Sequence, residues 1–131
     1  MQSISFDIES LLQRVSLVGV AVSALCREHG MDDTACFQIE TCVVEAVNNA
    51  IIHAYDNEAG NNLHIEWLME NKQVTITVSD TGKTMTQAIS DKLVASESES
   101  GRGWFIMNKW TDSVFYASID GVNTTTLEKF I

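Results

Sequence analysis

Five segments of the chain have the residue pattern of β-strands. In the first, Ile4, Phe6 and Ile8 alternate with polar residues, the period expected when one face of a strand is buried. Only Asn71 and Lys72 separate the second and third segments, which predicts a hairpin. The predicted strands are residues 4–8, 63–70, 73–79, 112–118 and 124–131, and the last two are joined by a turn at Asp120 and Gly121.

Helices are predicted where apolar residues recur at the helical period of about 3.6 residues. Asp32 and Asp33 precede one such segment, and either can cap it. The predicted helices are residues 11–26, a segment from Asp32 or Asp33 to about Tyr55, and a segment that opens at residues 101–103. The polar stretch from Thr86 to Ser100 has only a weak helical pattern and is predicted to be a mobile loop.

The order of these elements predicts an α+β fold, a two-layer α/β sandwich in which a mixed sheet carries helices on one face. With 131 residues, the chain is long enough to bury a core without disulfides or metal. Its composition gives no sign of a second domain. We therefore expect a single domain over residues 1–131.

The sulfur and aromatic residues are assigned to packing. The three cysteines lack CxxC spacing and lie in apolar helical segments, so reduced core thiols are expected rather than a disulfide or a zinc site. The tryptophans lie on a predicted strand and helix, where core or interface packing is favoured over base stacking. These residues are Cys26, Cys36, Cys42, Trp67, Trp104 and Trp110.

The chain is acidic, with a formal net charge of −10. This charge argues against direct binding to nucleic acid or to an anionic membrane, because both need a basic surface. It does not exclude a nucleotide, whose phosphates can be held by backbone N–H groups and an accompanying Mg²⁺. The sequence has no signal peptide pattern and no apolar run of the ~18–20 residues that a membrane helix needs, so a cytoplasmic protein is expected.

Polar side chains form a stripe on the second predicted helix. Glu45, Asn49 and His53 are spaced four residues apart in the mainly apolar segment EAVNNAIIHAY, which places them on one side of the helix. A carboxylate, a carboxamide and an imidazole are costly to bury. The stripe therefore either lines a cavity or is satisfied by hydrogen bonds inside the protein.

Three segments in order, EAVNNAIIHAY, VSDTG and SGRGWFIM, resemble the N, G1 and G2 boxes of the Bergerat-fold ATP-binding superfamily of gyrase, histidine kinases and MutL. The short chain, the HAY ending and the form ESGRGWFIM more narrowly resemble the bacterial anti-sigma factor serine kinases of the RsbW and SpoIIAB type. One box is weak evidence, but three in order are specific. The resemblance implies a Bergerat fold that binds ATP and Mg²⁺.

The resemblance assigns Asn49 to Mg²⁺, and a neutral amide oxygen suits a metal that also takes phosphate and water oxygens. Glu45, one turn earlier, is placed to accept a proton from an attacking hydroxyl or water as the catalytic base. The alternative for both is a helix residue hydrogen-bonded to a neighbouring strand. For His53 the alternatives are a packing residue and a contact to the nucleotide.

Base recognition is expected at the end of the third predicted strand. Asp80 follows the apolar run VTITV, so its carboxylate should emerge where a pocket forms and can accept from the adenine amine. The matching aspartate of the family selects adenine. Gly82 is expected to let the backbone approach the base closely, with an ordinary turn glycine as the alternative. By resemblance, Thr125 on the last strand is a further nucleotide contact.

The third helix opens with the residues expected at the phosphates. Gly101 and Gly103 flank its start, where unpaired N–H groups and the helix dipole favour phosphate oxygens. Arg102 either adds a charge-assisted contact to the phosphates or faces a partner.

One residue departs from the family pattern. The G1 box usually continues as DxGxG, and Thr84 stands where the second glycine is expected. A β-branched residue resists positive φ, so either the backbone there is ordinary or the lid that follows is restricted in its motion. The departure and the short lid favour nucleotide binding over fast turnover.

The resemblance implies a serine/threonine-protein kinase that phosphorylates a STAS-domain anti-sigma factor antagonist and alternately sequesters a sigma factor. It also implies a homodimer and a first-helix arginine facing the partner. Arg14 is the nearest candidate, with an ordinary surface arginine as the alternative. Two other functions are open: a non-catalytic, nucleotide-gated binding module, and a detached ATP-binding domain of a histidine kinase.

Overall fold

The computed structural model describes residues 1–85 and 99–131. The predicted strands and helices are confirmed within them, and the predicted loop falls mainly on residues 86–98, outside the described part. The elements in chain order are β1 (Gln2–Glu9), η1 (Leu12–Arg14), α1 (Val15–Glu28), α2 (Asp33–Asn49), η2 (Ala50–Ala54), β2 (Asn62–Glu70), β3 (Gln73–Asp80), α4 (Glu99–Trp110), β4 (Ser113–Ile119) and β5 (Val122–Phe130).

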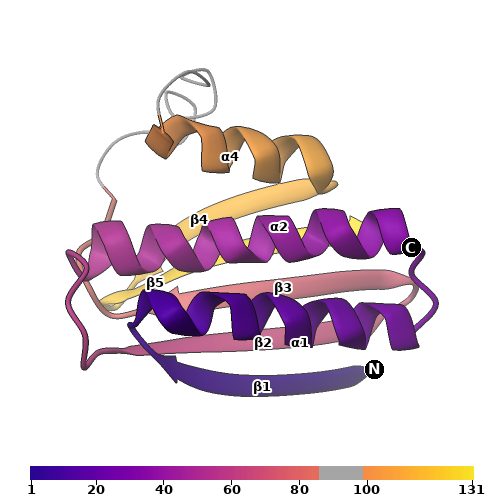
Figure 1. The fold of residues 1–131 in the computed structure, drawn as a ribbon, viewed down its shortest axis with the longest axis horizontal. Coiled ribbons are helices and arrows are strands. Elements are labelled where there is room, and N and C mark those ends of the chain that lie inside the picture. Colours follow the sequence, from indigo (N-terminus) through magenta and orange to yellow (C-terminus); the bar gives the residue numbers. More distant parts are fainter. Residues whose placement is uncertain (86–98) are drawn as a thin grey trace.

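The strands form one sheet in the order β1-β2-β3-β5-β4, with helices over one of its faces (Figure 1). The predicted α+β two-layer sandwich is therefore confirmed. The prediction that the sheet is mixed is wrong, because every pairing in the described part is antiparallel.

The connections explain the antiparallel sheet. Two helices separate β1 from β2, and they return the chain to the end of the sheet where β1 finished, so β2 runs back beside β1. A single crossover helix would have given a parallel neighbour. The hairpin strand β5 inserts between β3 and β4, so these two strands never pair directly.

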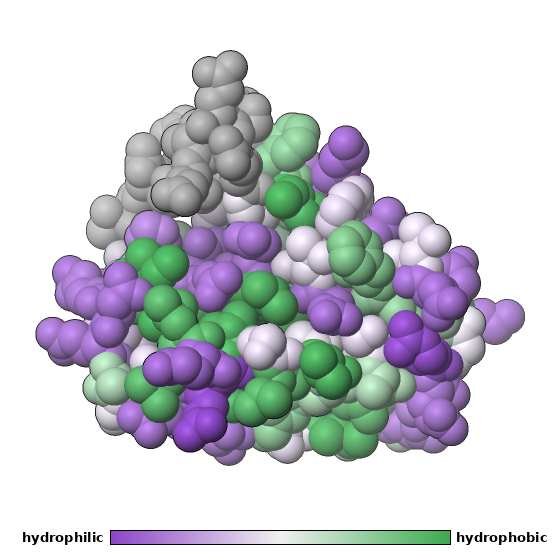
Figure 2. Space-filling view, in the orientation of Figure 1, coloured by the Kyte–Doolittle hydropathy of each residue, from purple (hydrophilic) through white to green (hydrophobic). Residues whose placement is uncertain are grey.

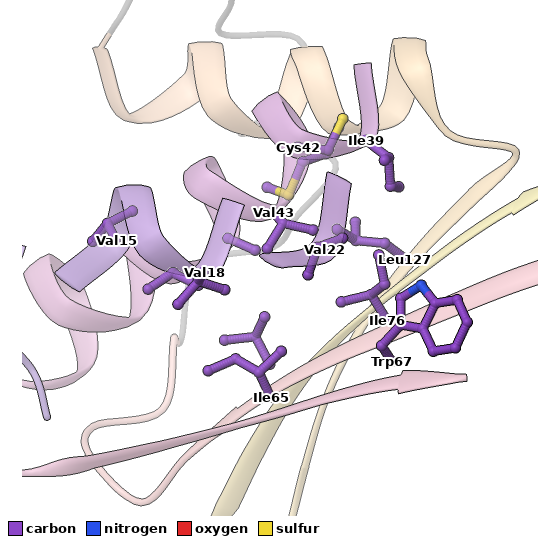
Figure 3. Close-up of a cluster of buried hydrophobic side chains, with 14 of the residues drawn as sticks. Val15, Val18, Val22, Ile39, Cys42, Val43, Ile65, Trp67, Ile76 and Leu127 are labelled. Atoms are coloured by element: carbon purple, nitrogen blue, oxygen red, sulfur yellow. The ribbon is translucent and has the colours of Figure 1, made fainter. Parts of the chain in front are cut away.

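The core lies between the helices and the sheet. Figure 3 shows Val18, Val22 and Val43 of the helices pointing toward Ile65 and Ile76 of the sheet. All five side chains are at most 1% exposed. Within the described residues, no helix is long and apolar enough to cross a membrane.

The assignments of sulfur and aromatic residues to packing are confirmed where burial is complete. Trp67 and Trp104 are 0% and 1% exposed. All three cysteines are free and buried. Burial raises the pKa of Cys26 to about 11 and that of Cys42 to about 12, so these thiols stay protonated at neutral pH.

The helix that carries the polar stripe is fixed at both ends. At its start, the side chain of Asp32 accepts a hydrogen bond from the Ala35 N–H at 2.8 Å, which confirms the predicted cap. At its end, α2 passes into the π-helical turn η2. The hydroxyl of Tyr55 then donates to the Asn62 carbonyl at 2.7 Å and accepts from the Thr81 N–H at 2.9 Å. The end of the helix is thereby tied to β2 and to the turn after β3.

Candidate functional site

The polar stripe of α2 meets α4 at a glycine. A Cβ atom added to Gly103 would lie 2.7 Å from Glu45 Oε2 and 3.5 Å from Asn49 Nδ2. A larger residue here would force the Glu45 carboxylate to move away. The first and third sequence motifs, residues 45–55 and 100–107, therefore come together in space.

The amide of Asn49 has an unsatisfied donor. Its Nδ2 atom is buried and has no hydrogen-bond partner within the described residues. Leaving a buried amide donor unpaired costs about 1–3 kcal/mol, and such groups call for a specific explanation in a folded protein. In the described part of the chain, the Asn49 donor makes no hydrogen bond to a neighbouring strand, and the buried indole N–H groups of Trp67 and Trp104 are likewise unpaired there. The Asn49 amide is therefore open to a ligand, and its role stays a prediction.

Glu45 lies beside this amide in a half-buried position. Desolvation raises the pKa of its carboxyl above the ordinary value of 4.5, and no other cause contributes. A carboxylate with a raised pKa is a stronger base, which is the property that a proton acceptor at neutral pH requires. The raised pKa agrees with the role of a base, and that role stays a prediction.

Asp80 ends β3 and is 7% exposed. Its Oδ1 accepts hydrogen bonds from Asn123 Nδ2 at 2.7 Å and from the Gly82 N–H at 3.0 Å. Burial raises the pKa of Asp80, and these two hydrogen bonds oppose that increase. No hydrogen bond to Oδ2 is found among the residues that the structure describes, so this oxygen is available to a ligand.

A small cavity is lined by residues of α2, η2, β3, β4, β5 and the turn after β3, but not by Glu45 or Gly103. Its walls include the predicted contacts Asn49, His53, Asp80 and Thr125. Its other walls are Ala50, Ala54, Lys83, Met85 and Tyr116. Four of the residues predicted to bind nucleotide thus line one cavity, while their binding role stays a prediction, and the sequence reasoning did not identify Met85 and Tyr116.

The cavity is closed in this conformation. Its free volume is about 10 Å³, whereas small-molecule pockets measure roughly 300–1,000 Å³. The Met85 N–H donates to the Tyr116 hydroxyl at 2.9 Å and ties the chain after β3 to β4 across the cavity. The cavity would therefore have to widen before a nucleotide could enter.

Gly82 is required for a reason that the sequence did not predict. Its backbone passes directly against the end of η2, where an added Cβ would lie 2.3 Å from the Ala54 carbonyl oxygen. The next residue completes the contact, because the Lys83 N–H donates to the same oxygen at 2.9 Å. In this structure Gly82 joins the second motif to the first, and its close approach is to protein backbone.

We expect Gly82→Ala to disrupt both stability and the site. The contact is to backbone, which cannot rotate away as a side chain can, so the turn after Asp80 must shift. Overpacking of this kind costs typically about 1–3 kcal/mol. Urea denaturation measures the loss, with Gly121→Ala as a control, because that glycine has open space around it but a φ of 80°. The loss of unfolding free energy in Gly121→Ala reports backbone strain alone. If the loss in Gly82→Ala is no larger, the steric argument is contradicted.

Asn123 is the main residue that sequence reasoning missed. It is 1% exposed and lies near the start of β5, in register with Asp80. Its amide donates to Asp80 and also lies 3.1 Å and 3.2 Å from the carbonyls of Gly82 and Lys83. One sequence signal could have identified Asn123. In the alternating pattern of the last strand, it is a polar residue at a position that faces the helices, two residues before Thr125.

Thr84 has an ordinary backbone. It is not among the described non-glycine residues with positive φ. Of the two alternatives, an ordinary backbone and a restricted lid, the ordinary backbone is therefore observed. Its hydroxyl donates to Asn123 Oδ1 at 2.8 Å and lies 3.1 Å from Ser118 Oγ. The threonine that replaces the expected glycine therefore fastens the turn after β3 to β4 and β5.

The remaining predicted residues are placed only in part. Gly101 and Arg102 lie in the first turn of α4, and the side chain of Arg102 is outside the described part of the chain. Arg14 lies in η1, just before α1, and is exposed. These positions agree with contacts to phosphate and to a partner, and both roles stay predictions.

Residues 8–129 match the family model of the histidine kinase-like ATPase domain, and the chain belongs to this family. It is similar to an anti-sigma F factor of Anoxybacillus flavithermus, with 30% identity over 128 residues that cover 93% of this chain and 88% of the relative. An anti-sigma F factor of Oceanobacillus iheyensis is 33% identical over 118 residues, which cover 86% and 79%. The predicted resemblance to anti-sigma factors of the SpoIIAB type is thus confirmed.

Two solved structures share the fold. The RsbU and RsbW domains of a Mycobacterium tuberculosis protein give a TM-score of 0.74 at 15% identity, covering 99% of this chain and 32% of that one. The SiaB–SiaC complex from Pseudomonas aeruginosa gives 0.63 at 10% identity, covering 98% and 89%. At these identities the likeness confirms the Bergerat-type fold alone.

Proposed function

We propose that this protein is an ATP-binding serine/threonine-protein kinase that phosphorylates a STAS-domain anti-sigma factor antagonist and alternately sequesters a sigma factor. The observation that carries the proposal is the buried, unpartnered amide of Asn49 beside Glu45, where Gly103 of α4 meets α2. Membership of the ATPase family and the similarity to anti-sigma F factors support it. We further propose that the protein acts in the cytoplasm as a single-domain homodimer.

The donor set fits a nucleotide that brings its own metal. No cluster of three acidic, histidine or cysteine side chains able to hold a metal is found within residues 1–85 and 99–131. Asn49 would supply one neutral oxygen to Mg²⁺, and phosphate oxygens and water would supply the rest. Asp80 and Thr125 would contact the base, with His53 at the pocket wall, and Gly101 and Arg102 would hold phosphate at the start of α4.

The protein's own contribution to phosphate transfer is the placement of Glu45. When bound, Mg²⁺-ATP supplies the phosphoryl group. Glu45 accepts the proton of the partner's serine or threonine hydroxyl at its carboxylate, which burial keeps a competent base. Gly103, which has no side chain, lets the carboxylate of Glu45 lie close to the first turns of α4, where the phosphate would be held.

We expect Asn49→Ala to weaken binding of Mg²⁺-ATP by roughly tenfold or more, because the neutral oxygen and the unpartnered donor are both lost. Calorimetry with and without Mg²⁺ measures the effect, which should be larger when the metal is present. Asn48→Ala is the matched control, since Asn48 points about 100° away on the same helix. Equal effects of the two substitutions would mean that Asn49 is merely a buried helix residue.

The closed cavity supports a second candidate, a nucleotide-gated binding module without catalysis. A free volume of about 10 Å³ means that the cavity must widen for ATP to bind, which changes the surface around it. In that case ATP only shapes the surface seen by a partner, and Glu45 has no essential role.

The partner surface is proposed to lie on the helix-covered face. Figure 2 shows apolar side chains gathered over α1 and α2 on this face. Leu17 and Val20 of α1 are each 59% exposed, and Arg14 precedes them at the start of the same helix. An arginine beside exposed apolar residues suits a partner segment that presents a carboxylate and an apolar side chain.

Incubation with Mg²⁺, labelled ATP and the STAS-domain protein encoded nearest to this chain tests the proposal. The kinase function predicts phosphoserine or phosphothreonine on the antagonist. Binding of the antagonist that depends on ATP, without phosphate transfer, would favour the gated module. Label on a histidine would instead indicate a histidine kinase domain.

A further inference from the structure

Asn123 occupies an unusual position for a polar side chain. It is 1% exposed, and its amide contacts Asp80 on β3 and the turn that follows β3. No sequence motif includes Asn123, and the phosphate transfer proposed above does not use it. A buried amide with all its partners on one functional loop organises that loop.

The orientation of the Asn123 amide is fixed by its neighbours. Asp80 Oδ1 and the carbonyls of Gly82 and Lys83 are all acceptors, so the NH₂ group must face them. On the opposite side, the Thr84 hydroxyl donates to Asn123 Oδ1 at 2.8 Å. The reverse orientation would place an oxygen against three acceptors. Asn123 is therefore a donor to Asp80, and Thr84 stabilises it in that orientation.

We propose that Asn123 is the positioning residue that determines base specificity, because its donated hydrogen bond keeps Asp80 an acceptor toward the bound base. This inference rests on the nucleotide-binding function proposed above. An ionised carboxylate can only accept, and it matches the amine of adenine. A protonated carboxyl can donate, and it would match the carbonyl that hypoxanthine carries at the same place.

The physical basis is the balance of effects on Asp80. Burial favours its neutral form, and the hydrogen bond from Asn123 is the larger of the two bonds that oppose this tendency. Removing the donor therefore raises the pKa of Asp80 further. The variant should then carry a neutral, donating Asp80 up to a higher pH than the wild type does.

Other ionisable groups near Asp80 lie on several elements. His53 on η2, Lys83 after β3 and Tyr116 on β4 line the same cavity, and His64 on β2 lies with Asp80 along a hollow on the other side of the sheet. Lys83 pairs with Asp56 at 2.8 Å, and His64 pairs with Asp7 at 3.0 Å. All are present in the wild type and in the variants, so a comparison between them isolates the effect of Asn123.

The test compares the affinities of ATP and ITP from pH 5.5 to pH 8. In the wild type, the preference for ATP should be at least roughly thirtyfold and nearly constant between pH 6 and pH 8. In Asn123→Ala, the preference should fall severalfold or more between pH 8 and pH 5.5, because loss of the donated hydrogen bond raises the pKa of Asp80 further and brings its neutral, donating form into this range. Asn123→Ser keeps one donor in less volume and should give an intermediate profile.

Thr124→Val is the control, since Thr124 is next to Asn123 on β5 but its hydroxyl lies 3.1 Å from Ser79 Oγ and makes no hydrogen bond to Asp80 among the described residues. It should keep the pH profile of the wild type. Thermal unfolding of each variant verifies that the compared proteins are folded.

Two results would overturn this inference and leave the proposed function standing. One is a set of folded Asn123 variants with the pH profile of the wild type, and the other is a wild type whose preference for ATP already collapses by pH 6. The second result requires no variant to fold. A wild type that binds neither nucleotide would overturn the proposed function, and this inference with it.

Discussion

Replacing Glu45 with glutamine is expected to leave ATP binding intact and to slow phosphate transfer to the partner by roughly a hundredfold or more. Glutamine keeps the size of the side chain and its place against Gly103 but cannot accept the proton of the attacking hydroxyl. Single-turnover transfer from labelled ATP gives the rate, and calorimetry gives the affinity. Glu40→Gln, on the same helix and away from the cavity, is the matched control.

The same substitution has an expected effect on stability. The folded-state pKa of Glu45 lies above its ordinary value of 4.5, so this group favours the folded state at lower pH, and the contribution is lost as pH rises through the raised pKa. An uncharged glutamine avoids burying a charge at neutral pH. Glu45→Gln should therefore be at least as stable as the wild type at pH 7. Loss of transfer together with loss of stability would mean that the variant is misfolded and would contradict the catalytic interpretation.

Asp80 is expected to give the protein at least ~2 kcal/mol of preference for ATP over GTP, roughly thirtyfold in affinity. The carboxylate accepts from the adenine amine and repels the guanine carbonyl oxygen at the same place. In Asp80→Asn, whose amide can present either a donor or an acceptor, most of this preference should disappear. Competition between the two nucleotides measures it.

A control for the charge change is available on the β4–β5 turn. Asp120 is exposed and has a φ of 52°, a conformation that asparagine tolerates, so Asp120→Asn removes one negative charge with little strain. It should leave the preference for ATP unchanged. Equal affinity of the wild-type protein for ATP and GTP would remove the role assigned to Asp80.

Much of the fold follows from local pattern. Both hairpins are predictable because a period of two and a very short connection leave the chain no other pairing. The start of α2 is predictable because the Asp32 cap is a local interaction. The mixed sheet is predicted wrongly, because strand order depends on where β5 inserts, and no local pattern encodes this insertion.

The site is predictable where one element carries several of its residues. Glu45, Asn49 and His53 share one helix, so their spacing alone places them together. Asn123 contributes through a contact between β3 and β5, and its partner Asp80 lies 43 residues away along the chain. Gly82 illustrates a second limit. The sequence indicates that a glycine is needed there, but only the structure identifies the Ala54 carbonyl as the reason.

The closed state of the cavity is also invisible in the sequence. The hydrogen bond between the Met85 N–H and Tyr116 crosses from the end of β3 to β4, and the Thr84 side chain reaches the same two-stranded edge. Both contacts depend on tertiary packing. A cavity of about 10 Å³ must widen before a nucleotide can bind, and the free energy needed to widen it lowers the apparent affinity.

Direct titration of ATP with Mg²⁺ into the wild-type protein tests the central claim, that the three motifs form a nucleotide site. We expect saturable binding of ATP at one site per chain. The affinity should fall when Mg²⁺ is withheld and when Asn49 is replaced by alanine. Absence of binding to a folded protein at millimolar ATP would contradict it.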